Sequence, residues 1–240
     1  MRRCSVLALL VLLLLPAGSV TAGPGTPGAA SPAAAAAAPP GLAAAGPFRR
    51  TGRSQPVFRI EAVTSARLGS SHRPGCPVAV ADLRLVTVTH VRFDGTTARG
   101  QLVVHRDAAA AVVRVFRALL TARFPVAQVR TVEAYGGDDG RSMAANNTSA
   151  YNCRRTTGGS SWSEHASGRA IDVNPVQNPY VRGTTVLPAP GRAYVDRSAA
   201  RPGMLLANGP AVRAFAAAGW SWGGSFTSLK DYQHFSASGR

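Results

Sequence analysis

The fold of this protein is decided by residues 163–174, which read SEHASGRAIDVN. The second half of this stretch alternates apolar and polar residues, a pattern that predicts a β-strand. On a strand, Asp172 faces away from Ile171 and Val173, because successive side chains point to opposite faces. His165 lies on the loop before the strand, and Gly168 lets the chain fold back. We therefore expect a strand with the core on one face and a polar cleft on the other.

A histidine and a carboxylate brought together in this way are two of the three protein ligands typical of a catalytic zinc. The third ligand must come from elsewhere, and His234 in the segment Asp231-Tyr232-Gln233-His234 is the candidate. A bound zinc lowers the pKa of its water from about 15.7 towards about 7, and a general base must still move the proton. Asp231 lies three residues before His234, a spacing that suits the general base. Glu164, next to His165, is expected to point away from the metal.

Other polar and aromatic residues near the motif have two interpretations. Arg154 could hold a substrate carboxylate or stabilise an oxyanion, or it could be one of many surface arginines. The tryptophans could line a cleft, but packing in the core is their ordinary role. The remaining histidines, His72, His90 and His105, are interpreted as ordinary surface or strand residues.

The first 47 residues have the composition of an exported protein. Arg2 and Arg3, an apolar run from residue 6 to 15 and small residues up to Ala22 predict a signal peptide over 1–22, with an uncleaved anchor as the alternative. Residues 23–47 are almost entirely Ala, Gly, Pro and Ser, which predicts a disordered linker. Residues 48–240 then form one domain, and no membrane span is expected after signal cleavage. We expect a secreted or wall-associated monomer.

Cysteine usage and charge add two expectations. Cys76 and Cys153 remain after signal removal and are predicted to pair in an oxidising compartment, with two buried thiols as the alternative. The net charge is +16, carried by arginine except for Lys230, so anionic polymers are possible partners. The arginines are scattered and no nucleic-acid-binding motif is found, so no nucleic-acid partner is expected.

The order of the predicted elements indicates an α+β protein with antiparallel hairpins. We expect a helical segment over 57–68, strands over 82–93 and 99–105 joined at Asp94-Gly95, and a helix from an Asp107 N-cap to about Arg123. A strand over 129–135 and an irregular segment over 175–201 follow. A last helix begins at Asn208-Gly209-Pro210 and ends at Gly219.

The motifs together closely resemble the zinc peptidases of the D-alanyl-D-alanine carboxypeptidase family, which also includes L-alanyl-D-glutamate endopeptidases. The resemblance rests on Ser163-x-His165-x-x-Gly168-x-Ala170-x-Asp172 and Asp231-x-x-His234, and it extends over residues 70–236 through RPGCP, YGGDD, NTSAYNCR, NPVQNPY and GWSWGG, as in the exported, actinobacterial-type branch. It implies an α+β fold with an antiparallel sheet and flanking helices, shared with the hedgehog signalling domain. It further implies Zn²⁺ held by His165, Asp172 and His234, with Asp231 as general acid/base and Arg154 as a substrate contact.

The function predicted from these observations is zinc-dependent hydrolysis of peptidoglycan stem peptides, by a carboxypeptidase or an endopeptidase. The alternative is a non-catalytic wall-binding protein on the same fold, suggested by the linker and the positive charge. A nucleic-acid binder is the third interpretation. The motifs do not separate the D-Ala–D-Ala bond from the L-Ala–D-Glu bond.

Overall fold

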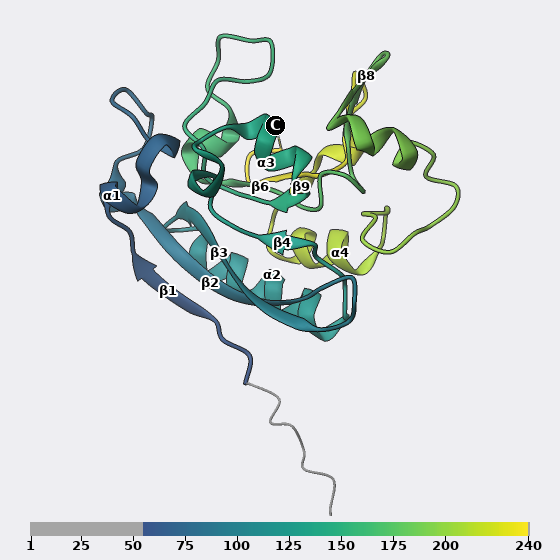
Figure 1. The fold of residues 1–240 in the computed structure, drawn as a ribbon, viewed down its shortest axis with the longest axis horizontal. Helices are drawn as coiled ribbons and strands as arrows, with labels where there is room; N and C mark the ends of the chain where they lie inside the picture. The colour runs from purple at the N-terminus through teal and green to yellow at the C-terminus, as the bar shows by residue number, and fades with distance from the viewer. Residues whose placement is uncertain (1–54, 240) are drawn as a thin grey trace, which may run out of the picture. The chain divides into compact units, whose positions relative to one another are not determined.

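The computed structural model describes residues 55–239. The predicted signal peptide and linker, and the first residues of the predicted peptidase domain, lie outside these described residues. A three-stranded antiparallel sheet is formed in the order β1-β2-β3 by β1 (Arg59–Ala62), β2 (Leu83–Val91) and β3 (Thr97–His105). β2 and β3 are the long strands of Figure 1, and they pair from Leu83↔His105 to Val91↔Thr97.

Three smaller sheets complete the domain. The order β6-β11-β9 joins β6 (Ala170–Asp172), β11 (His234–Ser236) and β9 (Ser221–Trp222), and the order β10-β7-β8 joins β10 (Lys230–Asp231), β7 (Tyr180–Arg182) and β8 (Thr185–Leu187). The short strands β4 (Gln128–Val129) and β5 (Asn147–Thr148) pair in parallel. The helices are α1 (Ser65–Leu68), α2 (Ala109–Thr121), α3 (Asp139–Ala144) and α4 (Pro210–Ala217). The predicted α+β class with antiparallel sheets is confirmed.

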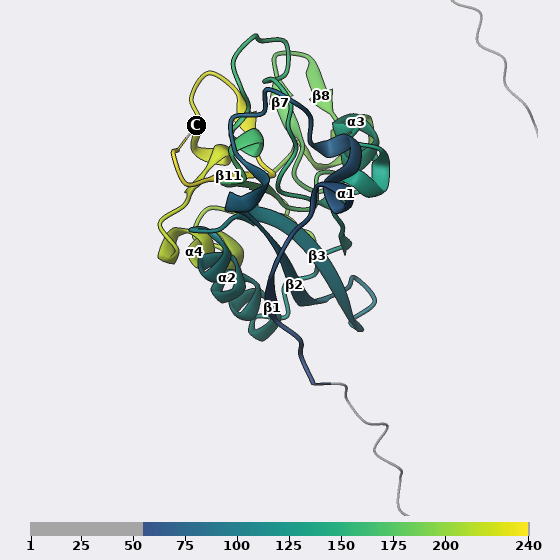
Figure 2. The ribbon, with the colours of Figure 1, turned by 90° about the vertical axis from the view of Figure 1, so that its left-hand side faces the viewer.

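The core lies between α2, the long hairpin and the strands that carry the motif. The buried side of α2 packs into one cluster with alternate residues of β2 and β3, namely Val112, Val115, Phe116, Leu119, Val86, Val88, Leu102 and Val104. α4 lies beside α2 and also packs against this cluster (Figure 2). Ile171 of β6 and Phe235 of β11 are fully buried in the same cluster, and the Phe235 ring stacks on Phe215 with centroids 3.8 Å apart. The strands of the motif are therefore fixed to the core through their apolar side chains.

The predicted disulfide is present. Cys76 and Cys153 are bonded, with their Cα atoms 5.8 Å apart and a sequence separation of 77. The chain-entropy model gives such a long loop a stabilisation of about 4–5 kcal/mol. The backbone N–H of Cys153 also donates to the Ser71 carbonyl, so the segment before the motif is fixed to the first part of the domain.

Several predictions of secondary structure were wrong, each for a tertiary reason. The expected helix over 57–68 is instead β1 followed by one helical turn, because the edge of β2 offers β1 a ladder from Arg59↔Thr87 to Ala62↔Arg84. Asp107 does not cap α2, since its carboxylate accepts from Arg169 Nη2 at 2.6 Å. Of the expected 129–135 strand, only Val129 belongs to a strand, as the second residue of β4, and Val132–Tyr135 forms a 3₁₀ turn. The segment expected to be irregular contains the hairpin β7–β8.

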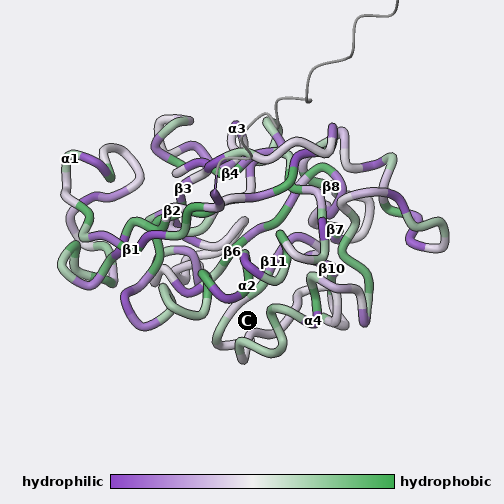
Figure 3. The backbone as a smooth tube through the Cα atoms, turned by 90° about the horizontal axis from the view of Figure 1, so that it is seen from below, coloured by the Kyte–Doolittle hydropathy of each residue, from purple (hydrophilic) through white to green (hydrophobic). Residues whose placement is uncertain are grey.

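Hydrophobic and hydrophilic residues are interleaved along the chain trace, as Figure 3 shows. Within residues 55–239 no helix combines the length and the apolar composition needed to cross a membrane.

His90 on β2 is a buried polar residue with an unusual environment. His90 is only 3% exposed, and neither of its ring nitrogens has a hydrogen-bond partner within the described residues. Burial, and to a lesser degree the charge of Arg92, lower the pKa of His90 from 6.5 to about 4. The folded chain therefore holds His90 neutral at pH values where the unfolded chain would protonate it.

We predict that this residue makes the domain sensitive to mild acid. Between pH 6.5 and 4 the unfolded state binds a proton that the folded state does not, so the free energy of unfolding falls as the pH falls. The loss attributable to His90 reaches at most about 3 kcal/mol by pH 4. Urea unfolding of the wild-type protein and of His90→Leu, followed from pH 7 to pH 4, measures this difference. Parallel pH profiles for the two proteins would show that His90 does not carry the effect.

Candidate functional site

Two of the predicted ligands face each other across a strand pair. β6 and β11 are antiparallel, and Asp172 lies directly opposite His234 in their register. Directly opposed residues in such a pair place their side chains on the same face, so both project away from the core side occupied by Ile171 and Phe235. The Asp172 Oδ1 atom is 3.0 Å from His234 Nδ1.

His165 reaches the same point from the 3₁₀ turn Glu164–Ser167. The Ser163 hydroxyl caps this turn by accepting from the His165 N–H, and Gly168 ends it with a φ of 71°. A Cβ at Gly168 would lie 2.6 Å from the His105 backbone nitrogen, so glycine is required both by its conformation and by the close approach of β3. The predicted chain reversal at Gly168 is thereby confirmed.

Hydrogen bonding orients the His165 ring for ligation. Its Nδ1–H donates to the Ala150 carbonyl at 2.6 Å, which leaves the Nε2 lone pair directed at the other two side chains. Nε2 lies 3.1 Å from Asp172 Oδ2 and 3.3 Å from His234 Nδ1. The three residues are buried, and one ligand atom from each lies within 4.8 Å of the others.

This cluster fits a metal ion. Burial alone would raise the pKa of Asp172, but His165 first, and then His234, hold it well below its usual range. A buried carboxylate and two imidazole nitrogens that converge on one point are the donor set of a cation site, and two histidines with one carboxylate suit zinc and related ions. The hydrogen bond from His165 to a backbone carbonyl is the supporting contact usual for metal-bound histidines.

The cluster lies at a cleft of about 460 Å³. Asp231 of β10 lines this cleft, and its Oδ1 atom is buried without a hydrogen-bond partner. Burial raises the pKa of Asp231 to about 6; His234 opposes this shift and the charge of Asp172 assists it. Glu164 also lines the cleft but is not part of the His–Asp–His cluster.

Arg154 also lines the cleft. Its Nη2 atom is 3.0 Å from the Asp139 carboxylate, and its buried Nε–H has no partner. Asp139 is part of the YGGDD motif, but nothing in its spacing indicates that it pairs with Arg154. Arg182, Tyr180 and Leu187 reach the cleft from the β7–β8 hairpin, which the sequence analysis did not find.

The aromatic residues divide between the two roles considered for them. Trp220 is 7% exposed and belongs to the core cluster. Trp162 is half-buried and lines the cleft, with the Arg155 guanidinium 3.7 Å from its ring centroid. Trp222 donates from Nε1 to the Tyr232 carbonyl at 2.7 Å, which fixes the turn between Asp231 and His234.

Gly223 explains the glycines of the GWSWGG motif. A Cβ at this position would lie 2.6 Å from the Asp231 carbonyl oxygen, 3.0 Å from Asp231 Cβ and 3.2 Å from His234 Cβ. Because Gly223 has no side chain, its turn can pack directly against Asp231 and His234.

These contacts define an α+β domain with a buried His–Asp–His cluster, able to bind a metal ion, at a cleft that polar and apolar side chains both line. Residues 157–237 match the sequence model of a family described as D-alanyl-D-alanine carboxypeptidase. This segment contains all three cluster residues and Asp231, and the match confirms the family prediction for it. It indicates a peptidase. No curated protein and no solved structure matches the chain.

We predict that the cluster binds a divalent transition metal and that His234→Ala weakens this binding by about 100-fold or more, since one of three ligands is lost. Equilibrium dialysis with Zn²⁺ or Co²⁺ measures the affinity. The matched control is His105→Ala, which removes a histidine that contacts Asp107 and Arg169 on the surface. Equal affinities for the two variants would show that the cluster is not the metal site.

We also predict that Gly223→Ala lowers metal affinity at least about tenfold, because the new methyl group must displace the turn that holds His234. The same dialysis measurement tests it, with a thermal unfolding scan to establish that the variant is folded. Gly140→Ala is the control, since a Cβ there would meet its nearest neighbour, Asp138 Oδ1, at an ordinary 3.4 Å. A Gly223→Ala protein with unchanged affinity would contradict the supporting role.

Proposed function

We propose that this protein is a zinc-dependent peptidase that hydrolyses stem peptides of peptidoglycan outside the cytoplasm. The observation that carries the proposal is the convergence of His165, Asp172 and His234 in a cleft that Asp231 and Arg154 also line. The match of the same segment to the carboxypeptidase family supports it. The N-terminal sequence pattern and the disulfide between Cys76 and Cys153 support an oxidising location outside the cytoplasm.

Zinc is the ion proposed for the cluster, with His165 Nε2, His234 Nδ1 and the Asp172 carboxylate as its protein ligands. When bound, zinc supplies a Lewis acid that polarises a carbonyl and makes a water molecule acidic near neutral pH. Three protein ligands are the number used by catalytic zinc sites, which keep one position open. Because His165, Asp172 and His234 all line the cleft, a peptide bound there would lie beside the ion they would hold.

Asp231 is proposed as the general acid/base. Peptide hydrolysis requires a group that takes a proton from the attacking water and then delivers it to the leaving amine nitrogen. Asp231 lines the cleft with an unpartnered Oδ1 and is held beside His234 by the turn that Trp222 and Gly223 support. These contacts support the proposed role of Asp231 beside the cluster.

Arg154 is proposed to bind a carboxylate of the substrate. Its Nη2 is engaged by Asp139, which holds the side chain in position, while its Nε–H is left with no partner in a water-poor site. A buried unpaired donor is costly, so a substrate carboxylate that satisfies it would gain binding energy. A carboxypeptidase needs such a group for the end of the peptide.

We predict that Asp231→Asn abolishes proton transfer while leaving the metal ligands intact. The expected loss in kcat is about 10²–10⁴-fold, with metal affinity retained, because the amide cannot serve as the base. Hydrolysis of a soluble stem peptide that ends in D-Ala–D-Ala, followed by release of D-alanine, measures it. The control Asp196→Asn changes an exposed carboxylate that accepts only from Ser198.

Mass spectrometry of a muropeptide digest shows whether the D-Ala–D-Ala bond or the L-Ala–D-Glu bond is cleaved. Loss of one terminal D-alanine identifies a carboxypeptidase, and cleavage after the L-alanine identifies an endopeptidase. A fully active Asp231→Asn protein would exclude the proposed role of Asp231. A protein that binds zinc and walls but releases no product from several wall types would instead be the non-catalytic wall-binding protein.

A further inference from the structure

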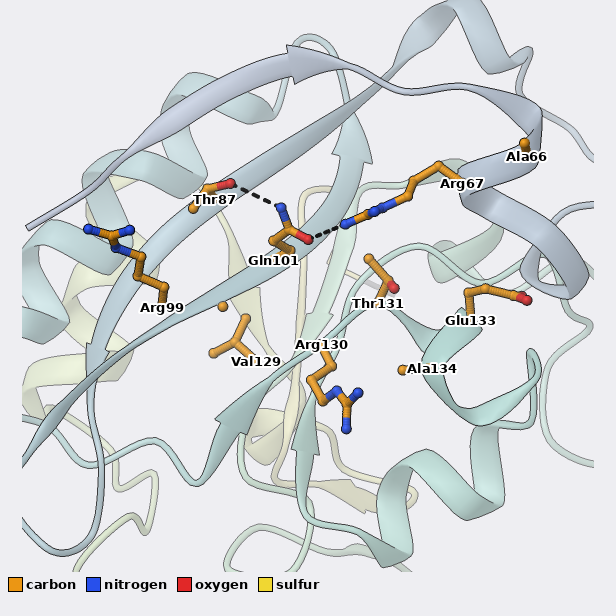
Figure 4. Close-up of a pocket in the computed structure, with 11 residues that line it drawn as sticks. Ala66, Arg67, Thr87, Arg99, Gln101, Val129, Arg130, Thr131, Glu133 and Ala134 are labelled. Carbon is orange, nitrogen blue, oxygen red and sulfur yellow. Dashed lines mark hydrogen bonds between the residues drawn. The ribbon is translucent and has the colours of Figure 1, made fainter.

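A second hollow lies on the open part of the β1-β2-β3 sheet and shares no lining residue with the catalytic cleft. It has a volume of about 620 Å³, and it is bounded by α1, by the middle of β2 and β3, and by residues 129–134. Figure 4 shows Arg67, Arg99 and Arg130 at three different sides of this hollow, with Gln101 and Thr87 on the sheet between them. We call it the arginine hollow.

The arginines of this hollow are not neutralised by the protein. Within residues 55–239, Arg67, Arg99 and Arg130 form no ion pair with a carboxylate. Glu133 is the only acid that lines the hollow, and its carboxylate accepts from the Ser71 backbone N–H at 3.1 Å. The positive charge is therefore available to a ligand.

Part of the hollow is ordered in advance. Arg67 Nη2 donates to Gln101 Oε1 at 2.5 Å, and Gln101 Nε2 donates to Thr87 Oγ1 at 3.3 Å, as the dashed lines of Figure 4 show. Arg130 has its guanidinium carbon 5.9 Å from the centroid of the Tyr135 ring. Side chains held in this way lose less conformational freedom when a ligand binds.

An adjoining hollow adds an independent observation. It measures about 420 Å³, shares Arg99, Val129 and Arg130 with the arginine hollow, and is also lined by Arg92 and His90. His90 is only 3% exposed, yet neither of its ring nitrogens has a hydrogen-bond partner within the described residues. Among the described residues, no carboxylate lines this adjoining hollow. Arg92, Arg99 and Arg130 therefore bring three guanidinium groups without a carboxylate partner among residues 55–239 to this hollow, above the buried His90 ring, and such groups suit an anion.

We propose that these two joined hollows bind a strand of a phosphodiester polymer of the cell wall, at a place separate from the catalytic cleft. The guanidinium groups stand at different sides and do not converge, so they suit successive phosphates of a chain better than one small anion. Arginine matches phosphate geometry with two parallel hydrogen bonds. The proposal that the polymer belongs to the wall rests on the proposed function.

A nucleic acid, the other polymer of this chemistry, fits less well. Proteins that bind single strands place aromatic rings under successive bases. The arginine hollow is lined by no phenylalanine, tyrosine or tryptophan, and His90 is the only ring in the adjoining one. The surface can therefore engage phosphates but offers the bases no stacking platform.

The test uses full-length protein and a synthetic poly(glycerol phosphate) chain labelled with a fluorophore. Anisotropy titrations at several salt concentrations give the affinity and its salt dependence. The triple variant Arg67→Gln, Arg99→Gln, Arg130→Gln is expected to bind at least about tenfold more weakly. Its plot of log affinity against log salt is expected to be shallower by about two units, since fewer counterions are released.

The matched control removes the same charge from exposed arginines elsewhere: Arg73→Gln, Arg114→Gln and Arg213→Gln. It is expected to lose less than about threefold, as general attraction alone would predict. An equal loss in both triple variants would overturn the proposal, as would tighter binding of single-stranded DNA through the same three arginines. Circular dichroism checks the fold, and Arg130→Gln alone replaces the triple variant if the latter is unfolded.

The outcome is separable from that for the catalytic site. Hydrolysis of a soluble stem peptide is measured on the same triple variant and is expected to be unchanged, because none of its residues lines the cleft. Hydrolysis without polymer binding would refute the polymer site alone. Polymer binding without hydrolysis would refute the peptidase alone.

Discussion

The antiparallel pairing of β6 with β11 is the interaction on which the rest of the site depends. Its register sets Asp172 opposite His234 and, one residue away, Ile171 opposite Phe235. One pair projects into the cleft and the other into the core, so the packing of Phe235 on Phe215 fixes the positions of the polar pair. A shift of one residue would exchange the faces and bury a carboxylate among apolar side chains, which makes this register strongly specified.

The third member of the cluster depends on a different set of contacts. His165 is held by the Ala150 carbonyl, and residues 149–153 are themselves tied to Asp172, Val103 and Ser71 through backbone hydrogen bonds and to Cys76 through the disulfide. The disulfide thus acts at one end of a segment whose other end orients the His165 ring. Arg154 follows directly, so the same anchoring brings its guanidinium to the cleft, where it pairs with Asp139 of α3. The same hydrogen bonds and the disulfide therefore stabilise the fold and position the side chains at the cleft.

Charge is distributed according to role. In the cleft, positive and negative groups are paired or converge, as with Arg154 and Asp139 or with Asp172 and the two histidines. On the sheet, Arg67, Arg92, Arg99 and Arg130 have no carboxylate partner within the described residues. Paired charges give an ordered site in which a proton or metal can be controlled, whereas unpaired charges attract polyanions. The net charge of +16 therefore does not have a single explanation.

The sequence by itself determined the identity and the pattern of the site: the alternation around Asp172, the glycine that ends the His165 turn, the Asp231–His234 spacing and the pairing of two cysteines. These are local features or depend on simple counting, so no long-range contact is needed to find them. Tertiary structure alone decided that 59–62 is a strand, that Asp107 pairs with Arg169, that Asp139 orients Arg154, and that hairpin β7–β8 forms part of the cleft wall. The physical reason is that each of these depends on which distant segment offers a hydrogen-bond edge or an opposite charge, and local propensity carries no information about that partner.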